Sequence, residues 1–114
     1  MEATDDRELL LRQRKFLHDI EQGIRQANQE IIHERIPELT RERFVEFALV
    51  VARLRASYLQ ASLEVSRGVP DLSEPAALCS ALKPHRVAYE EARDAFEALQ
   101  RAIERGYVDI GGVD

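Results

Sequence analysis

Cysteine, glycine, proline and lysine are all scarce in this chain of 114 residues. The single cysteine, Cys79, excludes a disulfide framework, or a zinc site made of cysteines alone, within one chain. It lies among alanines and leucines, so we expect a small buried hydrophobic residue there. Five glycines and four prolines leave long stretches without a helix breaker, and alanine, leucine, glutamate and arginine dominate. This composition is typical of long helices.

Basic charge is limited as well, because the net charge is −5 and only two lysines accompany 14 arginines. Such a chain lacks the concentrated basic surface that non-specific nucleic-acid binding requires. The most apolar stretch, residues 44–65, is long enough to span a bilayer, but charged residues that include Arg53 and Arg55 interrupt it. We therefore expect a cytoplasmic protein with neither a nucleic-acid nor a membrane partner.

Two long helices are predicted in the first part of the chain. The first opens at a possible capping box from Asp5 to Glu8 and ends before Pro37, because the residue before a proline resists helical geometry. The second begins after Thr40, a good N-cap, and ends where Gly68 and the following Val-Pro pair form a stop signal.

A third helical region follows a loop. Ser73 is a candidate N-cap, Pro75 fits the first turn, and Gly106 closes the helix. Pro84 lies in the middle of this region, where it either kinks one long helix or starts a new one, and we favour the kink. We expect one domain over residues 1–114, with flexible ends at about 1–4 and 107–114. The apolar residues of the C-terminal end allow it either to dock or to fray.

The first predicted helix carries one apolar arc with heptad-like spacing. At 100° per residue the arc spans about 100° and comprises Leu10, Leu17, Ile20, Ile24, Ala27 and Ile31. Gln13 and Asn28 fall on the same arc, where polar residues can specify register and partner number at a cost in stability.

The second predicted helix carries two apolar stripes. The first stripe comprises Phe44, Phe47, Val51, Leu54, Tyr58, Ser62 and Val65. The second stripe lies roughly 120° away and comprises Val45, Leu49, Ala52, Ala56, Leu59 and Leu63. Two neighbours in a three-helix bundle cover only part of so wide a surface, so we expect the second stripe to be an interface. Arg55 falls within the first stripe, and we expect it to pair with a carboxylate.

Only weak candidates for metal or hydrolytic chemistry are present. Glu30 and His33 have the Glu-x-x-His spacing that ferritin-like di-iron bundles use, but the motif occurs once and points away from the apolar arc. Only a site assembled between subunits could use them. Glu90, Glu91 and Asp94 give half of a paired carboxylate pattern, and arginines nearby can form surface ion pairs with Glu90 and Glu97.

Together these patterns predict an all-α protein, an antiparallel bundle of three long helices completed by homo-oligomerisation, with a homodimer favoured. The expected function is a non-enzymatic oligomerisation or adaptor module that binds another protein, with no cofactor and no catalytic residue. The alternative is a metal-binding or hydrolytic bundle whose site, including Glu30 and His33, forms between subunits.

Overall fold

The computed structural model describes residues 2–68 and 74–111 of the chain, without the side chains of residues 2–4. These residues are almost entirely helical, which confirms the all-α class. The described helices are α1 (Glu2–Arg35), α2 (Arg41–Gly68) and α3 (Pro75–Glu104). Two strands of two residues each, β1 (Leu39–Thr40) and β2 (Ile110–Gly111), form a parallel pair in which Leu39 lies opposite Ile110.

The ends of α1 and α2 follow the chain's local signals. Helix α1 begins at Glu2, earlier than the expected start at Asp5, and ends at Arg35, two residues before Pro37. Thr40 is the N-cap of α2, because its Oγ1 accepts a hydrogen bond from the backbone N–H of Arg43 at 3.3 Å. The stop signal expected after Gly68 lies outside the described residues.

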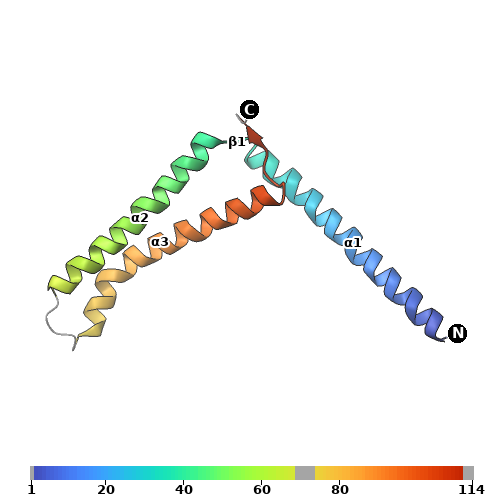
Figure 1. Cartoon of the computed structure of the whole chain (residues 1–114), viewed down its shortest axis with the longest axis horizontal. Coiled ribbons are helices and arrows are strands. Elements are labelled where there is room, and N and C mark those ends of the chain that lie inside the picture. The colour runs from blue at the N-terminus through green and yellow to red at the C-terminus, as the bar shows by residue number, and fades with distance from the viewer. Residues whose placement is uncertain (1, 69–73, 112–114) are drawn as a thin grey trace.

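Helix α3 runs without interruption through Pro84 and changes direction near it (Figure 1). Glu74 occupies the N-cap position, whereas the expected cap, Ser73, lies outside the described residues. At the other end Gly106 has φ 74°, a conformation that glycine adopts without strain. The N–H of Gly106 bonds to the carbonyl of Ile103, and that of Tyr107 to the carbonyl of Ala102, which is a Schellman motif.

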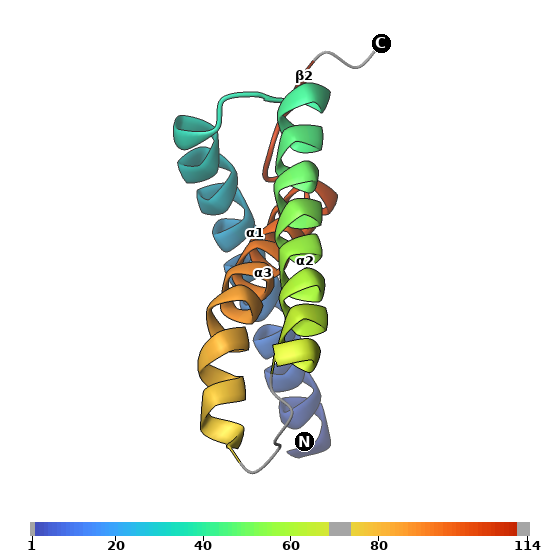
Figure 2. The same ribbon diagram turned by 90° about the vertical axis from the view of Figure 1, so that its left-hand side faces the viewer.

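Helices α2 and α3 form an antiparallel hairpin, and α1 points away from it (Figures 1 and 2). The result is a V-shaped chain with extents of 76 × 45 × 21 Å. A single chain therefore forms only the α2–α3 pair of the expected three-helix bundle. Helix α1 joins the hairpin through a short elbow, residues 36–40, and does not lie along either of the other helices.

The core of the described chain is small. Its buried hydrophobic residues are Leu39, Val51 and Val108. Residues 107–111, expected either to dock or to fray, dock on the elbow: β2 pairs with β1, and the N–H of Leu39 bonds to the carbonyl of Asp109 at 2.8 Å. The sequence carries no strand signal for this pair, because two residues are too few to show an alternating pattern.

Candidate interaction surface

The first stripe of α2 faces α3. The ring of Phe96 on α3 stacks on Phe44 with centroids 4.8 Å apart and meets Phe47 edge-on at 5.7 Å. Val51 is only 8% exposed, and the remaining members of the stripe are half-buried. Aromatic pairs at these separations stabilise a contact beyond the area that they bury. This stripe therefore holds the hairpin together.

Farther along the hairpin, Arg55 of α2 contacts Tyr89 of α3. The Nε of Arg55 donates a hydrogen bond to the Tyr89 hydroxyl at 3.1 Å, and its guanidinium lies 5.2 Å from the ring centroid. Arg93 contacts the same ring and pairs with Asp94 at 3.2 Å, which raises the pKa of Arg93 above its usual value. The expectation that Arg55 pairs with a carboxylate is therefore wrong. A phenol whose ring attracts cations takes that place.

The second stripe of α2 is exposed along its whole length. All six of its members are exposed, and the four large ones range from 48% exposed at Val45 and Leu49 to 69% at Leu63. No part of the described chain covers them, because α3 occupies the other side of α2. A continuous row of leucine, valine and alanine at the surface is unusual for a monomer and is typical of an interaction site.

The apolar arc of α1 is exposed too. Leu10, Leu17, Ile20, Ile24 and Ile31 each keep about half of their surface in contact with solvent, and Ala27 is exposed. Gln13 on the same arc is exposed, and Asn28 is half-buried. Phe16 lies beside the arc and is 63% exposed. This surface of a 34-residue helix has no hydrophobic partner in the part of the chain that the structure describes.

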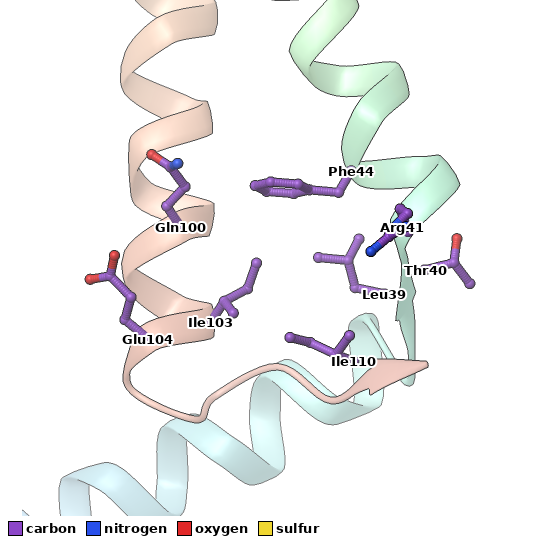
Figure 3. Close-up of a pocket in the computed structure, with 8 residues that line it drawn as sticks. All are labelled: Leu39, Thr40, Arg41, Phe44, Gln100, Ile103, Glu104 and Ile110. Atoms are coloured by element: carbon purple, nitrogen blue, oxygen red, sulfur yellow. The ribbon is translucent and has the colours of Figure 1, made fainter. Parts of the chain in front are cut away.

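At the elbow, the β1–β2 pair creates an apolar depression of about 350 Å³. Figure 3 shows the side chains of Leu39, Phe44, Ile103 and Ile110 converging on it from β1, α2, α3 and β2. Ile110 joins the other three side chains only because β2 docks, so no local sequence pattern predicts this concavity.

Glu30 and His33 lie on α1 near the elbow, where Asp109 contacts His33. The Nδ1 of His33 lies 3.0 Å from the Oδ2 of Asp109, while Glu30 accepts a hydrogen bond from Gln26 at 3.2 Å. Within residues 2–68 and 74–111, no three histidine, cysteine, aspartate or glutamate side chains come close enough to hold a metal ion. Cys79, expected to be buried, is exposed.

Comparison with protein families, curated proteins and solved structures gave no match. None of the helices in the described part of the chain is both long enough and apolar enough to cross a membrane.

Proposed function

We propose that this chain is a non-enzymatic helical module that associates with itself, as a homodimer, and serves to bind another protein. The observation that carries the proposal is the second stripe of α2, Val45, Leu49, Ala52, Ala56, Leu59 and Leu63, which is apolar, continuous and exposed. The association would complete the antiparallel helical bundle that one chain forms only in part.

Energetics support this proposal. Burying a leucine or valine side chain contributes about 1.5–3 kcal/mol, so the four large residues of the stripe offer a substantial driving force for association. With three buried hydrophobic residues in its described part, the single chain has a small core of its own. Small domains of this kind commonly gain stability by oligomerisation.

An adaptor role rests on apolar side chains that lie outside both the second stripe and the arc of α1. Leu9, Leu11 and Phe16 are each more than half exposed, and they offer a surface to a protein other than a second copy. A cytoplasmic location belongs to the same proposal, because a chain whose one cysteine is an exposed thiol suits a reducing compartment.

The test replaces both Leu49 and Leu59 by glutamate. Each charge would have to be buried against an apolar partner surface, which costs several kcal/mol, so we expect the dimer to separate into monomers. Light scattering coupled to size-exclusion chromatography measures the molar mass, and circular dichroism checks that the helices remain.

A matched control places glutamates at Ser57 and Gln60, two exposed positions on the polar side of the same helix. This variant adds as much negative charge and should keep the mass of the unmodified protein. If the unmodified protein is a monomer at micromolar concentration, self-association is not its function, and the second stripe belongs to a different partner.

A further inference from the structure

The exposed faces of α1 and α2 share one spacing. Steps of four, three, four, three and four residues separate six positions on each helix. On α1 they are Gln13, Leu17, Ile20, Ile24, Ala27 and Ile31, and on α2 they are Val45, Leu49, Ala52, Ala56, Leu59 and Leu63. Helices that match over six such layers, about 27 Å, can interlock their side chains as coiled coils do.

In three of its six layers, an antiparallel alignment of the two rows also places a large side chain opposite a small one. When the rows are paired from the elbow outward, every pair is equidistant in sequence from Glu38. Ile31 then meets Val45, and the next three layers place a large residue against alanine: Ala27 with Leu49, Ile24 with Ala52, and Ile20 with Ala56. Alternation of large and small residues across facing positions is what lets two helices approach closely and fill the space between them.

The same alignment pairs opposite charges beside the rows. Glu21 follows Ile20 on α1, and Arg53 follows Ala52 on α2, so each occupies the same position beside its row. In an antiparallel pair of helices these two positions face each other. Both residues are exposed in the single chain. A carboxylate opposite a guanidinium at this position favours this alignment over others.

Whether α1 and α2 can pack together within one chain depends on the conformation of the elbow. Closing α1 onto its own α2 would require residues 36–40 to become a tight turn, and contacts on both sides of the elbow oppose that. Leu39 is buried in the β1–β2 pair, His33 contacts Asp109, and the Nε2 of Gln29 donates a hydrogen bond to the carbonyl of Gly106 at 3.2 Å. These contacts hold α1 away from its own hairpin and leave both faces open to a second copy.

We infer that α1 of one copy docks antiparallel along the second stripe of α2 of another copy, and that the reciprocal contact forms at the same time. The inference rests on the proposed self-association and names the segment that occupies the stripe. Exchange of an identical element across a hinge is a common route to symmetric dimers. A two-fold axis near the two elbows would relate the copies, with the α1 arm of each V lying along the α2 arm of the other.

Charge exchange tests the pairing. Glu21→Arg and Arg53→Glu each place like charges at both contacts of a homodimer, so we expect each to weaken dimerisation about five-fold at low salt. A mixture of the two variants restores both pairs in a heterodimer. Native mass spectrometry should therefore find heterodimer well above the 1:2:1 statistical proportion, whereas a statistical mixture of dimers would overturn the inference.

Cysteine cross-linking gives an independent readout. In a Cys79→Ser background, Ile20→Cys with Ala56→Cys should yield a covalent dimer on oxidation, because the two thiols face each other between copies. Ser57→Cys in place of Ala56→Cys is the control and should not cross-link. A monomer with a disulfide between its own two cysteines would mean that α1 closes on its own hairpin. A dimer that forms no disulfide would mean that another segment covers α2. Either result would contradict the exchange of α1 between copies. The proposed self-association would be contradicted only if the unmodified protein is a monomer.

Discussion

Glu30 and His33 belong to the metal-binding alternative that the sequence offers, and both make ordinary surface contacts in the structure. His33 meets Asp109 while both side chains remain more than half exposed. Polar contacts between side chains as exposed as these contribute about 0–1 kcal/mol. Nothing in these contacts favours the metal-binding alternative over a charged surface next to the elbow.

We expect Glu30→Ala and His33→Ala each to change the free energy of unfolding by no more than about 0.5 kcal/mol, as is usual for surface positions. Chemical denaturation measures this change. Elemental analysis of the purified protein accompanies it, and stoichiometric iron or zinc that disappears in Glu30→Ala would establish the intersubunit metal site in place of the proposed function.

Helix α1 is the element in which polar and apolar requirements conflict. Gln13 and Asn28 interrupt an arc that is otherwise leucine, isoleucine and alanine. If the arc becomes a buried seam, each amide needs a hydrogen-bond partner, because a buried unpaired amide costs about 1–3 kcal/mol. Such residues are retained in helical seams because they disfavour other registers and partner numbers.

Replacement of both Gln13 and Asn28 by leucine is therefore expected to raise the thermal unfolding temperature and to broaden the distribution of oligomeric states. Differential scanning calorimetry and analytical ultracentrifugation measure the two effects. A single sharp species in the double variant would show that the amides stay in contact with water and have no part in choosing the register.

At the scale of the whole molecule, a V-shaped chain with a small core should depend on its partner for stability. Because a partner that binds only the folded chain stabilises it by mass action, the unfolding temperature should rise with protein concentration. Thermal scans between about 1 and 100 μM test this. An unfolding temperature that is constant over this range, together with a monomeric mass, would mean that the single chain is stable by itself.

Several elements could be predicted from local sequence because their causes are local. Pro37 ends α1, Thr40 caps α2, and Gly106 closes α3, each through the backbone of neighbouring residues. The side of α2 that faces α3 also followed from helical periodicity. The partner of Arg55 could not be predicted in this way, because Tyr89 lies on another helix.

The helical class, the three helices and the two apolar stripes of α2 could be predicted from the chain alone, because helix propensity and periodicity act within a few turns. The departure of α1 from the hairpin and the docking of residues 107–111 on the elbow could not. Those outcomes depend on contacts between residues far apart in sequence, such as Leu39 with Asp109 and Gln29 with Gly106. No local pattern encodes such contacts, because each requires the other element to be in place already.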